Sequence, residues 1–372
     1  MKHRFEVLDI FRGIFASMVV FFHMSGIPNT DFSHVPVLGN EFVHNSDLFV
    51  DFFFVLSGFV ITYTAQSMSR PADMQLFYKK RLFRLYPLHF IMLLVFVLME
   101  VGKHALAAHI QVNQLNNTNN SATTFFSNLF LLNSVKLPGV TDFSWNIPSW
   151  SISAEMVSYI LFGIVVWLIH RARIYRARNI VYGVIVVLAL ALLYMAAGDG
   201  ELTYKSFAFG FLRAWIGFFL GAICLNTFNG TRDRVITAPA ALFSILEIFI
   251  IAAMIVMVYD GKALKPYGYV YEILFFIAIY VFAFEKGVVS NLLKRVRLLK
   301  KIGTYSYSIY MIHAFFLSIF NIVFMRILKM PSTSYNYMFI VNYIIIYLAS
   351  SWTYKHIELK FQYKKKKVLT AV

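Results

Sequence analysis

Two residues that could take part in chemistry, Arg12 and His23, lie in the apolar segment LDIFRGIFASMVVFFH near the N-terminus. If this segment is a helix, eleven residues at about 100° each bring both side chains onto one face, about 16 Å apart along the axis. Charged and titratable groups inside an apolar span are costly and often mark functional sites. Asp9 stands three residues before Arg12, so a local Asp9–Arg12 ion pair is an alternative account of this arginine.

A carboxylate, Asp51, lies near the start of the next apolar segment, LFVDFFFVLSGFVIT. If this segment returns antiparallel to the first, Asp51 reaches the depth of His23. A carboxylate next to the imidazole would raise its basicity, which a general base needs. Taken alone, His23 could equally be a hydrogen-bonding residue at the membrane interface. Ser57 and Gly58 in the same segment are interpreted as small residues that serve helix packing.

A basic motif, KKRLFRLYP, places Arg81 and Arg84 three residues apart, and hence on one face of a helix. Two interpretations remain open. Basic residues at the cytoplasmic end of a span anchor it in the membrane. A pair of guanidinium groups also matches the geometry of phosphate oxygens and could form a phosphate clamp.

A carboxylate follows a serine-rich helix start in NIPSWSISAEMVSY, where Glu155 lies about one turn in. It could belong to a capping arrangement with Ser149 or Ser151. Alternatively, it faces the same outer cavity as His23 and Asp51. Further polar residues inside apolar segments have no partner that the sequence identifies; His313 in SYSIYMIH is interpreted as a packing or relay residue, and the others are Arg213, Glu247 and Glu272.

The elements that must position these residues are membrane-spanning helices. The chain has 372 residues, of which 59% are hydrophobic and only 14% charged. A soluble domain would carry about a quarter charged residues. We therefore predict an all-α polytopic membrane protein with about ten transmembrane helices. The ten apolar segments are 7–27, 48–66, 85–101, 152–169, 180–197, 205–227, 240–259, 267–284, 305–327 and 337–355.

The distribution of charge predicts the orientation. Most of the 34 Lys and Arg residues lie in loops on one side if the N-terminus is cytoplasmic, and an even number of spans then places both termini there. The net charge of +16 is typical of contact with anionic lipid headgroups and does not require nucleic acid. The long outer loop, residues 102–150, is either a solvated loop or part of a lid over an acceptor.

Several site classes are excluded. The single cysteine, Cys224, rules out an intrachain disulfide and a cysteine-based metal site. No metal-ligand pattern, phosphate-binding loop or dinucleotide fingerprint is present, and no Gly-x-Ser-x-Gly elbow of a serine hydrolase occurs. The first apolar segment contains Arg12 and no small-residue cleavage site follows it, so we interpret it as a retained helix rather than a signal peptide.

Taken together, the motifs resemble acyltransferase family 3, a family of integral membrane proteins that includes bacterial O-acetyltransferases of surface polysaccharides. The resemblance covers essentially the whole chain, in the family's order. It rests on LDIFRGIFASMVVFFH, VDFFFVLSGFVIT, RLFRLYP, PSWSISAE and SYSIYMIH. Some members carry an additional C-terminal hydrolase-like domain. This chain resembles the stand-alone form, with a transmembrane domain at 1–358 and a basic cytoplasmic tail at 359–372.

The resemblance implies an enzyme of a bacterial inner membrane. It would transfer an acyl group, expected to be acetyl, from cytoplasmic acetyl-CoA or another acyl-CoA. The acceptor would be a hydroxyl of a glycan or glycolipid at the outer face, and no metal would be needed. Arg12 and His23 match the Arg-x10-His motif, Arg81 and Arg84 match Arg-x-x-Arg, and Glu155 matches the acidic residue after Ser-Trp-Ser. The three arginines would bind the donor.

The sequence leaves two reaction paths open. His23 could act as a base for direct attack by the acceptor, with Asp51 or Glu155 orienting it, or it could carry the acyl group itself. A different class of function, a transporter or flippase for a lipid-linked glycan, also fits ten helices with buried charges. A scaffold subunit of a cell-envelope assembly is a third interpretation.

Overall fold

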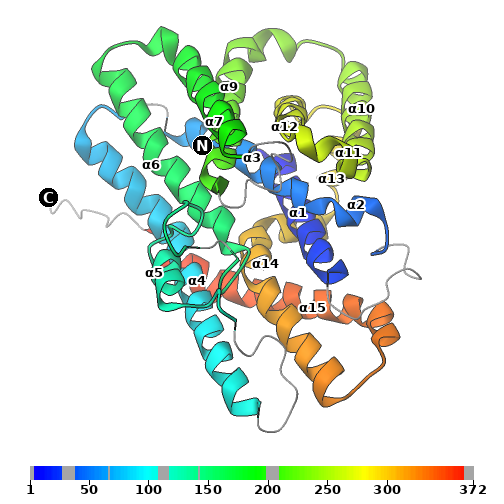
Figure 1. The fold of residues 1–372 in the computed structure, drawn as a ribbon. Helices are drawn as coiled ribbons and strands as arrows, with labels where there is room; N and C mark the ends of the chain where they lie inside the picture. Colours follow the sequence, from blue (N-terminus) through cyan, green and yellow to red (C-terminus); the bar gives the residue numbers. More distant parts are fainter. Residues whose placement is uncertain are drawn as a thin grey trace, which may run out of the picture.

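The computed structural model describes residues 4–26, 38–65, 68–107, 117–140, 143–197 and 209–363, and within these ranges it contains helices and no strand (Figure 1). Two π-helical turns, Ile322–Ile327 and Tyr354–Glu358, occur late in the chain. The α-helices are α1 (Glu6–Ser25), α2 (Glu41–His44), α3 (Phe49–Thr64), α4 (Pro71–Leu106), α5 (Ala122–Leu129), α6 (Ser149–Arg171), α7 (Arg178–Ala197), α9 (Gly210–Val235), α10 (Ala240–Tyr259), α11 (Gly261–Leu264), α12 (Tyr269–Phe282), α13 (Val288–Leu293), α14 (Arg297–Asn321), α15 (Tyr335–Thr353) and α16 (Leu359–Phe361).

Each of the ten predicted spans contains a helix, and the all-α polytopic class is confirmed. Among the described residues, eight helices are long and apolar enough to cross a membrane. A ninth span results if Gly261–Tyr267 and Tyr269–Phe282, which meet at an angle of 98°, count as one. The tenth, α15, is outside this set; its sequence YNYMFIVNYIIIYLASSWT carries tyrosines and asparagines that lower its hydropathy.

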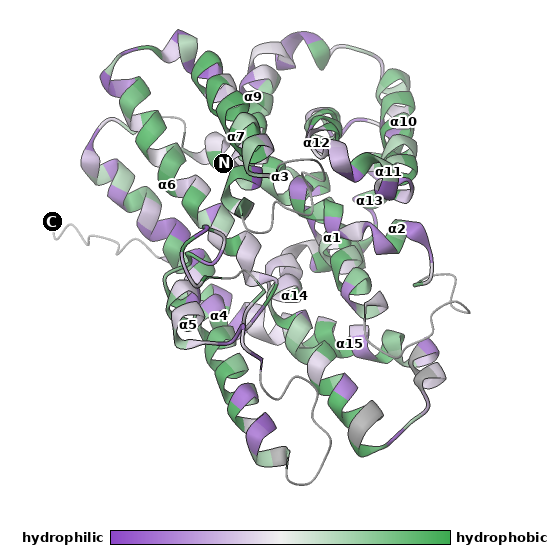
Figure 2. Cartoon of the chain, viewed as in Figure 1, coloured by the Kyte–Doolittle hydropathy of each residue, from purple (hydrophilic) through white to green (hydrophobic). Residues whose placement is uncertain are grey.

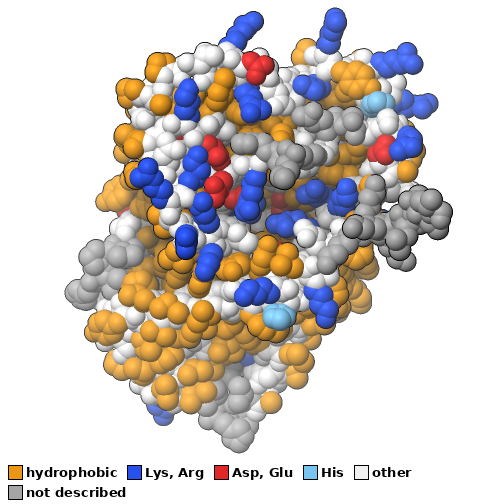
Figure 3. Space-filling model, turned by 180° about the vertical axis from the view of Figure 1, so that it is seen from behind, with side chains coloured by type: hydrophobic (Ala, Val, Ile, Leu, Met, Phe, Trp, Pro, Cys, Tyr) orange, Lys and Arg blue, Asp and Glu red, His pale blue; other side chains and the backbone are white. Residues whose placement is uncertain are grey.

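The outer surfaces of the bundle fit a lipid environment. Large apolar side chains are exposed along α7 and α10, among them Ile180, Val187, Met195 and Phe249. Both helices are coloured as largely hydrophobic in Figure 2. The opposite view in Figure 3 shows Lys and Arg side chains gathered across the upper part of one face and hydrophobic side chains across the lower part. The placement of both termini in the cytoplasm stays a prediction; residues 364–372 of the basic tail lie outside the described ranges.

Short local signals set the ends of several helices. α4 begins with Pro71, whose missing N–H costs nothing in the first turn, and Asp73 accepts a hydrogen bond of 3.0 Å from the backbone N–H of Arg70. At the start of α5, the side chain of Ser121 accepts from the N–H of Thr124. α4 then continues through the basic motif and past Pro87 into the third predicted span, so Arg81 and Arg84 stand on one long helix.

Two close helix crossings, each at a glycine, hold the central helices against each other. α1 packs along α14, and a Cβ at Gly13 would lie 2.4 Å from the backbone of Gly303. α3 packs along α9, where a Cβ at Gly58 would lie 1.8 Å from the carbonyl oxygen of Phe218. The packing role expected for Gly58 is therefore confirmed. The first crossing also brings Arg12, next to Gly13, against α14.

We expect Gly58→Ala to lower stability by about 3 kcal/mol, because the added methyl group would push the α9 backbone away. The midpoint of thermal unfolding in detergent, followed by the fraction of protein that elutes as a monodisperse peak, measures this. Gly183→Ala on α7 is the matched control, since no heavy atom lies within 4 Å of its added Cβ. Equal midpoints for the two variants would contradict the tight α3–α9 crossing.

The described part of the outer segment packs into the protein. Residues 117–140 and 143–150 include α5 and bury a polar network. Asn128 donates to Ser144 at 3.0 Å and accepts from Ser149 at 3.0 Å, and Asn146 donates to the carbonyl of Met311 on α14. The solvated-loop interpretation is wrong for this part, because hydrogen bonding compensates the burial of its polar groups. Residues 108–116 and 141–142 lie outside the described ranges, and a lid role stays a prediction.

Candidate active site

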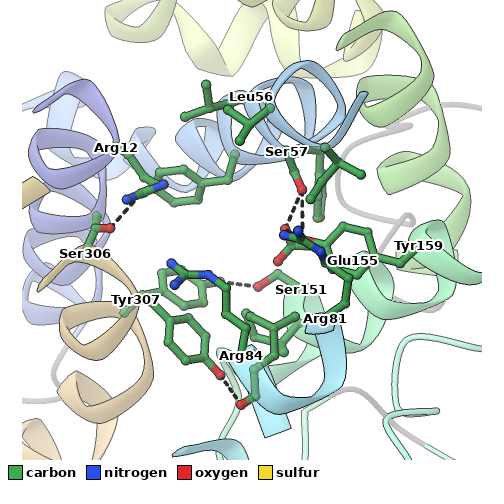
Figure 4. Close-up of a pocket in the computed structure, with 18 residues that line it drawn as sticks. Arg12, Leu56, Ser57, Arg81, Arg84, Ser151, Glu155, Tyr159, Ser306 and Tyr307 are labelled. Carbon is green, nitrogen blue, oxygen red and sulfur yellow. Dashed lines mark hydrogen bonds between the residues drawn. The ribbon is translucent and has the colours of Figure 1, made fainter. Parts of the chain in front are cut away.

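The three arginines expected to bind a donor meet in one cavity between α1, α3, α4, α6 and α14 (Figure 4). The space between its atoms amounts to about 820 Å³, including its open mouth. Besides the arginines, one carboxylate and several hydroxyl groups line it. The polar lining residues are Arg12, Ser57, Arg81, Arg84, Ser151, Glu155, Tyr159, Ser306, Tyr307 and Tyr310.

Arg12 is held in place by α14 and by its own helix. Its Nε donates to Ser306 Oγ at 2.8 Å, and an Nη donates to the carbonyl of Gly303 at 3.3 Å. Asp9 lies 3.2 Å from Arg12 and also pairs with Arg4 at 2.8 Å. The local Asp9–Arg12 pair foreseen as an alternative is therefore present. Arg12 nevertheless lines the cavity, so the two accounts of this residue coexist.

Arg81 and Arg84 bring positive charge into the cavity without a direct ion-pair partner. Neither forms an ion pair with any residue in the described ranges. The Nε of Arg81 is buried and has no hydrogen-bond partner there, although its guanidinium lies 5.7 Å from the centre of the Phe77 ring. A buried donor without a partner costs free energy. An anionic ligand with several acceptor oxygens would relieve this cost.

Glu155 lies with the arginines, which differs from the expectation that it shares an outer cavity with His23 and Asp51. Ser57 donates to its Oε1 at 2.5 Å, and the hydroxyl of Tyr159 donates to the same oxygen. The capping interpretation is also wrong, because α6 begins without a side-chain cap. Ser57 therefore faces the cavity and does more than fill a helix contact. Figure 4 shows Arg12 on one side of the cavity and Glu155 and Ser57 on the other, with Arg84 entering between them from α4.

Asp51 forms a buried salt bridge with Arg213, for which the sequence suggested no partner. Arg213 Nε donates to Asp51 Oδ1 at 2.6 Å and its Nη2 to Oδ2 at 2.8 Å. The two side chains are only 2% and 7% exposed. The expectation that Asp51 orients His23 is wrong, because a bidentate arginine engages both of its oxygens. The pair instead joins α3 to α9, the two helices that also cross closely at Gly58.

We expect Asp51→Ala to lower stability by about 3–5 kcal/mol, because it leaves the Arg213 charge buried and unpaired. Replacing both partners, as in Asp51→Leu with Arg213→Met, should cost less than Asp51→Ala alone. Thermal unfolding of the three proteins in detergent tests this. A stable Asp51→Asn protein that has lost all transfer activity would restore the catalytic interpretation of Asp51.

His23 lies against His313 rather than against a carboxylate. His313 Nε2 is 3.3 Å from His23 Nδ1, and His23 Nδ1 is also 2.9 Å from the carbonyl oxygen of Val19. His313 is fully buried, in line with a packing or relay role. Its ring centre is 5.8 Å from that of Tyr310, which lines the cavity. The histidine pair therefore follows directly beyond the cavity along α1 and α14.

Sequence reasoning missed the hydroxyl residues of α14. Ser306, Tyr310 and His313 are four and three residues apart, a spacing that places them on one helix face. This spacing could have indicated that α14 lines the site.

Glu247 has a structural role outside the cavity, because it accepts hydrogen bonds from the N–H groups of Gly287 and Ser290 at the start of α13. Glu272 lines a small cavity together with Asp51 and Arg213.

Comparisons with known proteins add one finding. A family model described as an acyltransferase domain matches residues 5–354, nearly the whole chain. No curated protein and no solved structure gives a match.

Among the described residues, no group of three or more His, Cys, Asp and Glu side chains is placed to hold a metal ion.

Proposed function

The chain belongs to acyltransferase family 3, and on this premise we propose that it is an O-acyltransferase of a bacterial inner membrane. It transfers an acyl group, expected to be acetyl, from cytoplasmic acyl-coenzyme A to a hydroxyl of a glycan or glycolipid at the outer face. The observation that supports the donor most strongly is the cavity with Arg12, Arg81 and Arg84 and the single carboxylate of Glu155. Coenzyme A is a polyanion, and arginine forks are suited to its phosphates.

The donor's phosphates are bound by the arginines, and Glu155 limits the net positive charge of the cavity. Ser57 and Tyr159 hold this carboxylate in place. The helical rise between Arg12 and His23 is about 16 Å, a distance that the pantetheine arm of the donor can span. The thioester then reaches the histidine pair beyond the cavity, while the nucleotide stays with the arginines.

His23 removes the proton of the acceptor hydroxyl, and the oxygen attacks the carbonyl carbon of the thioester. The carbon–sulfur bond breaks, the new ester bond remains on the acceptor, and coenzyme A leaves as a thiol after His23 returns the proton to its sulfur. A path through an acyl-histidine uses the same residue as the nucleophile. Rapid-quench experiments that search for acyl-labelled protein distinguish the two paths.

The function is tested with purified protein, acetyl-coenzyme A and an envelope extract from cells that lack the gene. We expect release of free coenzyme A together with a gain of one acetyl mass on a surface glycan. The same mass should be lost from the glycans of intact cells when the gene is deleted. Movement of a lipid-linked glycan across vesicles without any release of coenzyme A would instead favour the transporter alternative.

A further inference from the structure

We propose that His313 is the positioning residue of His23: its Nε2 accepts the Nδ1–H hydrogen bond of His23, which leaves Nε2 of His23 as the basic nitrogen. That this nitrogen removes the proton of the acceptor hydroxyl rests on the proposed function. It assigns to an uncharged imidazole the role that sequence reasoning gave to Asp51 or Glu155.

The backbone determines which ring nitrogens carry hydrogen. His23 Nδ1 lies 2.9 Å from the carbonyl oxygen of Val19, and His313 Nδ1 lies 3.3 Å from that of Ile309. A carbonyl oxygen can only accept a hydrogen bond, so both Nδ1 atoms are protonated in the neutral rings. Each ring then has an unprotonated Nε2. The opposite assignment for His23 would point a nitrogen lone pair at the Val19 oxygen.

The direction of the contact between the rings follows from these tautomers. His313 Nε2, without a hydrogen, lies 3.3 Å from His23 Nδ1 and therefore accepts from it. The Nδ1–H of His23 is shared between this nitrogen and the Val19 oxygen. Both Nδ1 contacts of His23 thus orient its ring, and the free Nε2 is the nitrogen left to take a proton from an acceptor.

The two carboxylates that could instead orient His23 accept hydrogen bonds from other side chains. Both oxygens of Asp51 accept from Arg213, and Glu155 lies in the donor cavity, where Ser57 and Tyr159 donate to it. Within the described ranges, no carboxylate lies within hydrogen-bond distance of either histidine ring. His313 is buried to 0% exposure, whereas His23 is partly exposed. The pair thus has a buried ring, His313, which positions its neighbour, and a partly exposed ring, His23, which can react.

A neutral partner suits a base that must give its proton back. When His23 is protonated at Nε2, its Nδ1–H becomes a charge-assisted donor, and both His313 Nε2 and the Val19 oxygen bind it more strongly. Because neither acceptor is charged, the imidazolium is oriented without being neutralised. The proton therefore remains available for the sulfur of the departing coenzyme A.

The inference is tested by the rate at which diethyl pyrocarbonate modifies His23, read by mass spectrometry of the His23 peptide. This reagent attacks the unprotonated nitrogen of a neutral imidazole and needs neither donor nor acceptor of the acyl group. In the full-length wild-type protein we expect modification at His23 and protection of His313. An unmodified wild-type His23 would overturn the assignment of Nε2 as the open nitrogen.

Variants of His313 separate positioning from packing. His313→Phe keeps the ring volume but lacks the acceptor, and we expect the rate at His23 to fall about tenfold, as the loss of one hydrogen bond to a developing charge implies. His313→Gln places its amide oxygen near the position of Nε2 and should retain most of the rate. His313→Asn is too short and should behave like His313→Phe. His89→Phe, which removes another buried histidine on α4, is the matched control and should leave the rate unchanged.

Equal rates at His23 in His313→Gln and His313→Asn would overturn the positioning role, even if His313→Phe fails to fold. The same applies if folded His313→Phe modifies at the wild-type rate. Two-bond ¹H–¹⁵N spectra of histidine-labelled protein provide an independent check, since both rings should show the Nδ1–H tautomer. If these results hold but His23→Ala retains acyl transfer, the proposed function fails while the histidine pair stands.

Discussion

Replacement of His23 with alanine is expected to lower the rate of acyl transfer by about 10²–10⁴-fold, the usual contribution of a general acid–base group. The reason is geometric as well as chemical. His23 lies beyond the arginine cavity, next to His313, so its removal takes away the proposed base without touching the arginines proposed to bind phosphate. Coenzyme A release from acetyl-coenzyme A in the presence of the envelope extract measures the rate.

The control for this variant is the affinity for the donor. Isothermal titration of the purified protein with coenzyme A should give nearly the same dissociation constant for His23→Ala and the wild type. A variant that transfers at the wild-type rate would remove His23 from the chemistry. A variant that loses donor binding as well would show that the histidine pair supports the cavity itself.

Replacement of Arg84 with alanine is expected to weaken donor binding by about 10- to 100-fold, because hydrogen bonds to charged groups contribute about 1.5–3 kcal/mol. Arg84 has no ion-pair partner in the described ranges, so its charge is free for the ligand and its loss strands no carboxylate. The same titration with coenzyme A measures the effect. At saturating donor, the rate of transfer should recover toward the wild-type value.

Two matched variants sharpen this result. Arg84→Lys keeps the charge but loses the fork, and we expect an intermediate affinity. Arg234→Ala removes an exposed arginine from the last turn of α9, outside the cavity, and should leave the affinity unchanged. If Arg84→Ala and Arg234→Ala lowered the affinity equally, the cluster would act only as a general basic surface, as membrane anchoring requires.

The arginine cavity and the histidine pair follow each other along α1 and α14. Arg12 and Ser306 belong to the cavity, and His23 and His313 lie further along the same two helices. The Gly13–Gly303 crossing keeps these helices at contact distance. Tyr310 belongs to both regions, because it lines the cavity and packs against His313. A donor bound by its phosphates would thus have its reactive end directed toward the histidine pair.

The sequence alone determined the class of the protein and pointed to Arg12, Arg81, Arg84 and Glu155, which the structure places in the candidate cavity. Apolar runs of sufficient length can satisfy their backbone in a membrane only as helices, so composition and periodicity predict the fold class directly. Residues on one helix have relative positions that helical geometry dictates. For this reason the shared face of Arg12 and His23 and the pairing of Arg81 with Arg84 could be predicted from spacing.

Only the tertiary structure decided which helices face each other and at what depth. Asp51 and Arg213 are 162 residues apart, and His23 and His313 are 290 apart, so no local rule connects them. Depth in the membrane suggested Asp51 as the partner of His23, but the rotation of α3 against α9 turns this carboxylate toward Arg213. α3 and α9 approach closely at Gly58, and a contact between two backbones leaves no pattern in a single sequence that identifies its partner. Glu155 was misplaced for the same reason, since its depth along α6 depends on how the preceding segment packs inward.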